Sequence, residues 1–385
     1  MRFLRDFNFK NKRVLVRADF NISLKDGRLV NDFKIRACLP TIEYLLKQKA
    51  KIILLTHLGR PSGQPKEELK VDPIGQKISQ LTSQPVKKLD NCIGPGIEQT
   101  AKEMKPGQIV LLENLRFHSE EKNNQPDFAK QLAKLGEIYV DDAFANVHRA
   151  HASMVGLPQY LPNCAGLLLE KEIKSLSNVL LQTKRPLTVI IGGVKISTKI
   201  KVIKNFLEKA DNLILGGALA NTVISAKGFA VGQSIIEEEM VEQVKKLELT
   251  NIKLHIPVDI IVSTDLQGQA PTRIAPVGHI EEKEMILDIG PDTYELFKRI
   301  ISQSKMIVWN GPMGVFENEK FASGSREMAQ IVAQTNGFSV VGGGETITLL
   351  EQLNLTDKID HISTGGGAML NFLAGQKLPG IEALK

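Results

Sequence analysis

Short apolar runs alternate with longer amphipathic segments along almost the whole chain. The short runs are rich in β-branched residues and predict buried strands at residues 14–16, 52–55, 109–112, 138–140, 189–191, 213–215, 260–262, 306–308, 339–341 and 361–363. The longer segments repeat their apolar residues at helical spacing and predict helices at residues 35–48, 128–135, 198–208, 294–301 and 325–332. This alternation predicts an α/β fold in which helices cover parallel sheets on both faces.

A helical segment rich in charge and leucine, Leu167–Gln182, divides the chain. It lacks an evident cap, and the sequence Thr183-Lys184-Arg185-Pro186 ends it before the next predicted strand. A chain of 385 residues is long enough for two domains. We therefore expect this helix to join two similar α/β halves, with a cleft between them where a ligand from each half can meet. The tail Gly375–Lys385 has no evident place in either half.

The composition is that of an ordinary globular protein, with a net charge of +6. No basic block with interleaved aromatic residues is present, which argues against nucleic-acid binding. The three cysteines are far apart and form no CxxC pair, so disulfides and zinc are not expected. The N-terminus lacks the apolar core of a secretory signal, and no apolar run is long enough to span a bilayer. These features predict a cytoplasmic protein.

Two predicted strands near the C-terminus each end in three glycines, at residues 342–344 and 365–367, and each leads into a helical pattern. Residues without a Cβ let the backbone approach a ligand and direct N–H groups at it. The helix N-terminus behind each turn adds a partial positive charge. Two such turns predict a polyphosphate site held largely by backbone, in a chain that contains neither a Walker motif nor a GxGxxG dinucleotide motif.

Basic side chains follow four predicted strands in the first half, within residues 17–21, 56–61, 113–118 and 148–151. Ligands of parallel α/β sheets bind beyond the carboxyl ends of strands, so these four stretches are expected to converge on one crevice. A single arginine or histidine at such a position is usually a surface ion pair or a structural residue. Their recurrence favours a site for an anion that carries phosphate or carboxylate groups.

Three further stretches of the second half follow predicted strands. Lys195 and Lys199 come after Gly192-Gly193 and are predicted on one face of a helix near its N-terminus, where an anion between them is favoured over a solvated basic face. The turn at residues 216–218 is explained either by close packing or by a ligand. The loop at residues 309–317 suits a purine slot with ribose hydroxyls nearby, although a structural turn explains its Gly-Pro step equally well.

Nine motifs in order now identify a resemblance. They are RADFN (17–21), LPTI (39–42), THLGRP (56–61), LENLRFH (112–118), HRAHASMVG (148–156), GGVKISTK (192–199), WNGPMGVFE (309–317), GGGET (342–346) and STGGGA (363–368). Over essentially its whole length the chain resembles the phosphoglycerate kinases. The resemblance implies a glycolytic and gluconeogenic enzyme that reversibly transfers a phosphoryl group from 1,3-bisphosphoglycerate to Mg-ADP, giving 3-phosphoglycerate and ATP. It also implies a monomer without nucleic-acid or membrane partners.

The fold implied by the resemblance has two doubly wound parallel-sheet domains that face each other across a cleft. Residues 1–168 form the phosphoglycerate-binding domain, residues 169–183 the interdomain helix, and residues 184–374 the nucleotide-binding domain. The tail 375–385 packs back on the first domain. Closure of the two domains about this hinge is expected to accompany transfer.

The resemblance also implies roles for residues that match the family motifs. The phosphoglycerate side comprises Asp19, Phe20, Asn21, Lys34, His57, Leu58, Gly59, Arg60, Arg116 and Arg149. The catalytic set comprises Lys34, Lys195, Lys199, Gly366 and Gly367. The nucleotide side comprises Lys199, Gly217, Asn310, Pro312, Glu317, Gly343, Gly344, Glu345 and Thr346, with Glu345 as the ligand of Mg²⁺.

Two of these positions depart from the family pattern. Lys34 stands where the family has an arginine, which keeps the charge but loses the bidentate fork. Arg36, two residues on, is not expected to replace that arginine. Glu345 stands where the family has aspartate, and its extra methylene moves the carboxylate relative to a Mg²⁺ ion that binds oxygens at about 2.1 Å. The alternative prediction is therefore a catalytically weakened paralogue that still binds nucleotide or phosphoglycerate.

Overall fold

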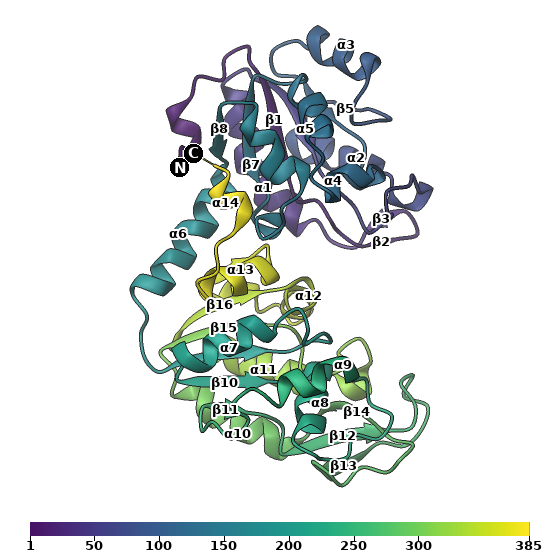
Figure 1. Ribbon diagram of the computed structural model, residues 1–385, viewed down its shortest axis with the longest axis vertical. Helices are drawn as coiled ribbons and strands as arrows, with labels where there is room; N and C mark the ends of the chain where they lie inside the picture. Colours follow the sequence, from purple (N-terminus) through teal and green to yellow (C-terminus); the bar gives the residue numbers. More distant parts are fainter. Residues whose placement is uncertain (385) are drawn as a thin grey trace. The chain divides into compact units, whose positions relative to one another are not determined.

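The computed structural model describes residues 1–384 and divides into two compact units (Figure 1). The first unit comprises Met1–Ser177 together with Gly375–Lys385, and the second comprises Asn178–Ala374. The division falls inside helix α6 (Leu167–Leu181), the segment that sequence analysis takes as the connection. Each unit is built on a six-stranded parallel sheet, which confirms the predicted fold class.

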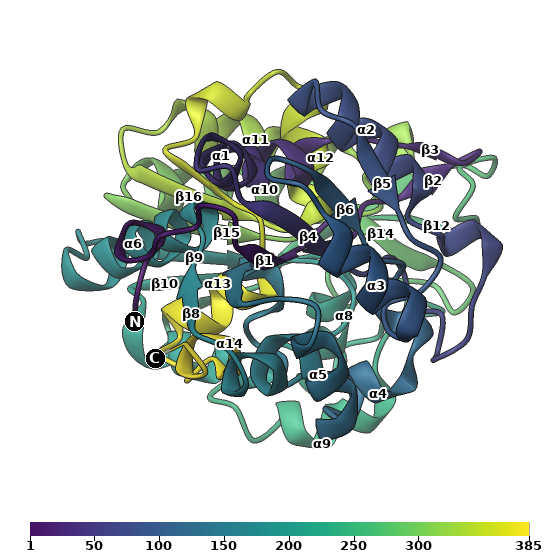
Figure 2. The same ribbon diagram turned by 90° about the horizontal axis from the view of Figure 1, so that it is seen from above.

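The sheet of the first unit has the strand order β5-β6-β4-β1-β7-β8. Its strands are β1 (Arg13–Ala18), β4 (Lys51–Leu55), β5 (Val86–Lys88), β6 (Ile109–Leu111), β7 (Ile138–Asp142) and β8 (Asn163–Ala165), and β2 (Leu24–Lys25) and β3 (Arg28–Leu29) form a small antiparallel pair. Its helices are α1 (Phe33–Lys47), α2 (Asp72–Thr82), α3 (Pro95–Glu103), α4 (Ser119–Lys122), α5 (Pro126–Ala133) and α14 (Pro379–Glu382). Figure 2 shows α1 and α2 on one face of β1, β4 and β6, and α3 and α5 on the other.

Strand order explains where a ligand can bind in this unit. From β1 the chain moves outward to β4 and β5, and it later returns past β1 to β7 and β8. Crossovers between parallel strands are right-handed as a rule, so connections that move across the sheet in opposite directions place their helices on opposite faces. A crevice therefore forms where the direction changes, beyond the carboxyl end of β1. The loops after β1, β4, β6 and β7 meet at this crevice.

Burial on both faces explains why these strands could be recognised. Val14, Val16, Ile52 and Leu54 are fully buried in one apolar cluster beneath the helices. Strands covered on both faces become continuous apolar runs rather than alternating ones. That pattern is the one from which residues 14–16 and 52–55 were predicted.

The second unit repeats the plan with the order β11-β10-β9-β15-β16-β17 (Figure 1). Its strands are β9 (Leu187–Ile191), β10 (Asn212–Leu215), β11 (Leu254–His255), β15 (Met306–Asn310), β16 (Phe338–Gly342) and β17 (His361–Ser363). Its helices are α7 (Ile200–Lys209), α8 (Gly217–Ala226), α9 (Glu238–Val244), α10 (Pro291–Ser302), α11 (Ser323–Gln334), α12 (Gly344–Gln352) and α13 (Gly366–Leu373). The buried Trp309 belongs to its main apolar core cluster.

One predicted strand belongs to a different sheet. Residues 260–262 lie in β12 (Asp259–Ser263), which pairs antiparallel with β13 (Arg273–Pro276) and β14 (Met285–Ile289). The prediction of a parallel strand was therefore wrong here. Parallel neighbours need a crossover of a dozen or more residues, usually a helix, and the segments between these three strands contain none.

One predicted helix begins later than expected. The helix predicted from residue 198 is α7, which starts at Ile200 with Lys199 as its N-cap residue. Lys195 and Lys199 therefore do not share a helix face, and that prediction was wrong. The backbone N–H and Oγ of Ser197 donate to the carboxylate of Glu237 at 2.8 and 2.5 Å, so this segment forms a loop with its own anchors.

Helix α6 is capped by a residue distant in the sequence. The Asp142 Oδ1 atom accepts from the N–H groups of Leu168 and Leu169 at 2.9 and 3.2 Å. A carboxylate there satisfies free N–H groups and stabilises the positive end of the helix. The tail joins the same unit, where the Gly380 N–H donates to the Val147 carbonyl at 2.8 Å. No helix within residues 1–384 combines the length and apolarity that crossing a membrane requires.

Candidate active site

The predicted phosphoglycerate residues of the first unit converge beyond the carboxyl ends of its strands. The Phe20 N–H donates to Thr56 Oγ1 at 3.0 Å, which joins the loops after β1 and β4. The Gly59 N–H donates to Asn21 Oδ1 at 2.8 Å, and Arg116 Nη1 donates to the Gly59 carbonyl at 2.8 Å. The loops after β1, β4 and β6 are thus tied into one structure.

A lysine–aspartate pair lies at the centre of these loops. Lys34, in the first turn of α1, places Nζ at 2.5 Å from Asp19 Oδ2. Burial is the largest single influence and opposes ionisation of Asp19, but the charge and hydrogen bond of Lys34 together with the neighbouring basic side chains hold the pKa of Asp19 well below its usual range. Arg36 points elsewhere, because its Nε donates to Asp32 at 2.8 Å. Lys34 is therefore the basic residue that α1 contributes to this site.

The crevice carries an excess of positive charge. Burial and the neighbouring Arg149 lower the pKa of Arg116 to about 10, and burial and Arg60 lower the pKa of Arg149. Within residues 1–384, the buried nitrogens without a hydrogen-bond partner include Arg116 Nε, Arg149 Nε, His148 Nδ1 and His151 Nδ1. Buried polar groups left unpaired are costly and mark places where a ligand completes the hydrogen bonding. The arrangement is suited to a small polyanion.

Some of the residues predicted to bind phosphoglycerate do not direct their side chains into the crevice. Phe20 and Leu58 are buried apolar residues whose side chains pack in the core. Gly59 has a φ of +62°, so it serves the shape of its loop and offers its carbonyl to Arg116. Arg60 is exposed and faces Arg149 closely enough to influence its ionisation.

In the second unit the turns that contain Gly193, Gly217 and Gly311 are joined by backbone hydrogen bonds. The Gly193 N–H donates to the Pro312 carbonyl and the Gly217 N–H to the Met313 carbonyl, both at 2.9 Å. A Cβ on Gly217 would lie 2.7 Å from the backbone of Gly193, and Gly217 has a φ of +64°. Gly217 is therefore required by backbone conformation and close packing, as one of the two interpretations of this turn predicted.

The two triple-glycine turns pack directly against each other around Asn310. Asn310 Nδ2 donates to the Gly342 carbonyl at 2.6 Å. A Cβ on Gly366 would lie 2.3 Å from Asn310 Nδ2, and Gly343 has a φ of +110°. By contrast, a Cβ on Gly344 or Gly367 would meet no protein atom within 4 Å. Within each predicted cradle, one glycine serves packing and another faces open space, where a ligand can approach.

Thr346 completes the packing of these turns. It is fully buried, and its Oγ1 accepts from the Gly311 N–H at 2.8 Å. The helices behind the turns begin at Gly344 (α12) and Gly366 (α13), as the motif pattern predicted. Free N–H groups at these helix starts are suited to phosphate oxygens.

The two predicted catalytic lysines differ in their surroundings. Lys199 Nζ donates to the Gly192 carbonyl at 2.5 Å and faces Glu345. Burial lowers the pKa of Lys199 to about 8, although Glu345 opposes the shift. Lys195 is exposed on the loop that Glu237 anchors through Ser197. The structure brings Lys199 to the glycine turns and leaves Lys195 at their edge.

An acidic pair lies beside Lys199. Desolvation by the surrounding protein and the charge of Glu317 raise the pKa of Glu345. Residues 1–384 contain no cluster of three or more acidic, histidine or cysteine side chains placed for a metal ion. Mg²⁺ is normally held by one or two carboxylates together with waters and substrate phosphates. The two carboxylates of Glu345 and Glu317 therefore fit a metal ion that arrives with a nucleotide.

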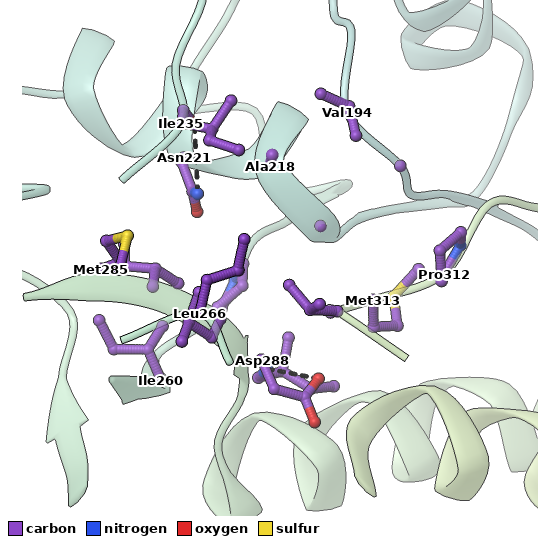
Figure 3. A pocket seen from close by; sticks show the side chains of 18 of the residues that line it. Val194, Ala218, Asn221, Ile235, Ile260, Leu266, Met285, Asp288, Pro312 and Met313 are labelled. Atoms are coloured by element: carbon purple, nitrogen blue, oxygen red, sulfur yellow. Dashed lines mark hydrogen bonds between the residues drawn. The ribbon is translucent and has the colours of Figure 1, made fainter. Parts of the chain in front are cut away.

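A mainly apolar pocket of about 260 Å³ adjoins these groups (Figure 3). Figure 3 shows Ile260, Leu266 and Met285 on one side of the pocket and Ala218, Asn221 and Ile235 on the other. Pro312, Glu317 and Glu345 also line it. Apolar walls with few polar groups suit the flat face of a nucleotide base, and two carboxylates in the lining suit a metal ion bound to its phosphates.

Sequence reasoning missed several residues of both sites. Arg17, His148 and His151 lie within motifs that were recognised, but they were not assigned roles. The concentration of basic residues at the end of β1 and in the loop after β7 was a usable signal. Leu266 and Met285 belong to the antiparallel region, which matches no motif, so no signal in the sequence pointed to them.

Comparison with known proteins accords with this geometry. The family model for phosphoglycerate kinase matches residues 4–376. Phosphoglycerate kinases of Moorella thermoacetica and Dictyoglomus turgidum are 47% and 46% identical over 385 and 387 residues, each covering 99% of this chain and 98% of the relative. Solved phosphoglycerate kinases of Coxiella burnetii and Pyrococcus horikoshii align with TM-scores of 0.79 and 0.87 at 39% and 36% identity, each covering 100% of this chain and 98% of the other. The chain belongs to the phosphoglycerate kinase family.

Proposed function

We propose that this kinase transfers a phosphoryl group reversibly between 1,3-bisphosphoglycerate and Mg-ADP, giving 3-phosphoglycerate and ATP. The observation that carries the proposal is a pair of complementary anion sites. One is the crevice of the first unit, where basic side chains surround the carboxylate of Asp19. The other is the group of glycine turns around Lys199 in the second unit.

Residues of the first unit hold the phosphoglycerate. Arg116, Arg149 and Arg60 supply guanidinium groups that suit phosphate and carboxylate oxygens. Lys34 exchanges its bond with Asp19 for the substrate carboxylate, and His57 and Asn21 complete the set of polar contacts. The buried, unpaired nitrogens of this crevice acquire partners when the anion binds, which favours binding.

Residues of the second unit hold the nucleotide and the moving phosphoryl group. The base occupies the apolar pocket, and Gly343, Gly344 and Thr346 belong to the phosphate side. The backbone N–H groups of Gly366 and Gly367, with Lys199 and Lys195, stabilise negative charge on the phosphoryl oxygens. Such transfer needs alignment and charge neutralisation rather than a protein nucleophile.

Mg²⁺, when bound with the nucleotide, neutralises phosphate charge and orients the phosphate chain. Glu345 would hold it, with the neighbouring Glu317 carboxylate adding to the negative potential. The residues for the two substrates belong to different units, so transfer requires closure that brings the bound substrates together and excludes water. We expect the enzyme to act as a cytoplasmic monomer.

The alternative of a catalytically weakened paralogue gains no support from the comparisons, because the matching relatives carry the name of the active enzyme. We expect the departures at Lys34 and Glu345 to change the rate of phosphoryl transfer and not the reaction that is catalysed. Lys34 retains a charged contact at the site through Asp19.

Steady-state transfer from Mg-ATP to 3-phosphoglycerate tests the proposal. Wild-type turnover is expected, with kcat about 10²- to 10³-fold lower in Lys199→Ala, because a donor that stabilises transition-state charge is lost. Lys201→Ala, an exposed lysine on α7, is the matched control and should retain wild-type rates. Absence of wild-type turnover, or equal rates in all three proteins, would contradict the assignment.

A further inference from the structure

Arg17 is a buried charge that the proposed mechanism does not use. It lies on β1 and is fully buried, as is nearly the whole side chain of His57 behind the phosphoglycerate crevice. An arginine is rarely buried unless its charge and hydrogen bonds are satisfied. The contacts that satisfy Arg17 therefore indicate what it does.

The Arg17 guanidinium contacts three groups: the Ser153 hydroxyl, the Ala18 carbonyl and the imidazole of His57. Its Nε donates to Ser153 Oγ at 2.9 Å, and Nη1 donates to the Ala18 carbonyl. Ser153 in turn donates to Glu121 through Oγ at 2.6 Å and through its backbone N–H at 2.9 Å. Glu121 is fully buried and is linked to Arg17 through Ser153, and the carboxyl groups of Asp19 and Asp141 also interact electrostatically with Arg17.

The remaining contact of Arg17 is with the imidazole of His57. Arg17 Nη2 lies 3.1 Å from His57 Nδ1. A guanidinium group has only donors and keeps its proton at any ordinary pH. Nδ1 must therefore accept, which leaves it without a proton. Asp19 Oδ1 is 3.9 Å from the same nitrogen, too far to compete as a hydrogen-bond acceptor from Nδ1.

A histidine whose Nδ1 accepts a hydrogen bond carries its proton on Nε2 when the ring is neutral. Protonating both nitrogens would direct the new N–H at the Arg17 N–H. Among residues 1–384 no group hydrogen-bonds to His57 Nε2, so this N–H is the one available to a ligand.

We propose that Arg17 is a positioning residue that locks His57 in its neutral Nε2–H tautomer, so that His57 donates one hydrogen bond to an anionic oxygen of phosphoglycerate. The identity of the ligand rests on the proposed function, whereas the tautomer does not. Glu121 and Ser153 hold Arg17 in place. The arrangement parallels histidine ligands of metals, whose second nitrogen is fixed by a neighbouring group.

The charges around His57 agree with a neutral ring. The titratable groups that face it are the cations Arg17, Arg116 and Lys34 and the anion Asp19. Burial is the main cause that lowers the pKa of His57 well below its ordinary value; Asp19 opposes the shift, and Arg17, Arg116 and Lys34 add to it. A further positive charge in this crevice would be repelled, while a neutral donor adds a directed hydrogen bond without that repulsion.

Nitrogen NMR of the protein labelled in its histidines tests the tautomer without any turnover. The His57 signals are assigned by their loss in His57→Gln. We expect Nδ1 to show the shift of an unprotonated nitrogen and Nε2 that of an N–H nitrogen, unchanged between about pH 5 and 8. A protonated Nδ1, or a ring that titrates in this range, would overturn the proposal.

A neutral double variant tests the role of Arg17. Arg17→Met alone leaves the Glu121 charge buried without its partner, so it is combined with Glu121→Gln. We expect the ring to titrate or change tautomer, and KM for 3-phosphoglycerate to rise about 10- to 100-fold while KM for Mg-ATP stays constant. Arg13→Met, at the other end of β1, is the control and should change neither. A changed tautomer with unchanged KM would overturn the positioning role.

The two proposals fail in distinguishable ways. A wild-type protein without turnover but with the expected tautomer would contradict the proposed reaction and support the inference about His57. An active wild-type protein whose His57 carries the proton on Nδ1 would contradict the inference and leave the reaction standing.

Discussion

Lys199 is expected to reduce the stability of the protein while serving its chemistry. Its ammonium group is largely removed from water beside the glycine turns, and burial lowers its pKa from 10.5 to about 8. Replacing it with methionine keeps much of the side-chain volume and removes the charge. Lys199→Met should therefore lose activity and gain stability at neutral pH, a trade-off typical of functional sites.

The size of the gain follows from the shift in pKa. A drop from 10.5 to about 8 corresponds to about 3 kcal/mol at 1.36 kcal/mol per unit. The lost hydrogen bond from Nζ to the Gly192 carbonyl offsets part of this, because such a bond contributes about 1 kcal/mol or more. The free energy of unfolding at pH 7 should rise by about 1–2 kcal/mol.

The gain should depend on pH in a defined direction. Below pH 8 Lys199 is charged in both the folded and unfolded states, so the wild type carries the full free-energy cost of burying the ammonium group. Between about pH 8 and 10.5 the unfolded state binds more protons than the folded one, and wild-type stability contributed by this group rises with pH. The difference between Lys199→Met and wild type should therefore shrink as the pH increases through this window.

Trp309 is a fluorescent probe of unfolding in the second unit. It is the only tryptophan of the chain, it is fully buried, and its strand β15 pairs with β9 just before the Lys199 loop. Urea unfolding followed by Trp309 fluorescence therefore reports the second unit. Lys195→Met is the control, because removal of an exposed lysine should change stability by no more than about 0.5 kcal/mol. Equal stability of Lys199→Met and wild type at pH 7, or a difference that grows with pH, would refute the reasoning.

Three further predictions test other parts of the site. Lys34→Arg restores a bidentate fork and should raise kcat/KM for 3-phosphoglycerate by up to about 10-fold; a decrease would show that the lysine is better accommodated here. Gly366→Ala forces a Cβ against the neighbouring asparagine amide and should cost about 1–3 kcal/mol in urea unfolding, whereas Gly367→Ala should leave stability nearly unchanged and lower kcat/KM for Mg-ATP; equal stability losses would contradict this. Glu237→Ala frees the lysine loop and should lower kcat about 10- to 100-fold, while Glu238→Ala, exposed and without such contacts, should not; equal rates would remove the anchoring role.

The sequence by itself determined the alternation of strands and helices and the motifs of both anion sites. Strands such as β4 and β9, buried on both faces, had to be continuous apolar runs, and these are readable without a structure. The triple-glycine turns were readable because a run of residues without a Cβ is unusual, and the structure requires glycine at Gly343, with its φ of +110°, and at Gly366, which packs against Asn310. The resemblance of nine motifs then extended this local information to the whole chain.

Only the tertiary structure decided features that depend on residues distant in the sequence. Helix α6 looked uncapped because its cap, Asp142, comes from β7. Helix α7 begins at Ile200 because Glu237, 40 residues away, holds Ser197 in a loop. The antiparallel partners of β12 were likewise hidden, because strand direction depends on pairing rather than on local composition.

The roles of individual glycines and basic residues also required the structure. Gly366 and Gly367 are identical as letters, yet one packs against Asn310 and the other faces open space. The sequence places Arg17 in a motif but gives no role for it, and its role becomes evident only from its contact with His57 in the structure. Sequence patterns specify which residue types a site contains, but hydrogen-bond partners, burial and charge balance arise only when segments far apart in the chain are brought together.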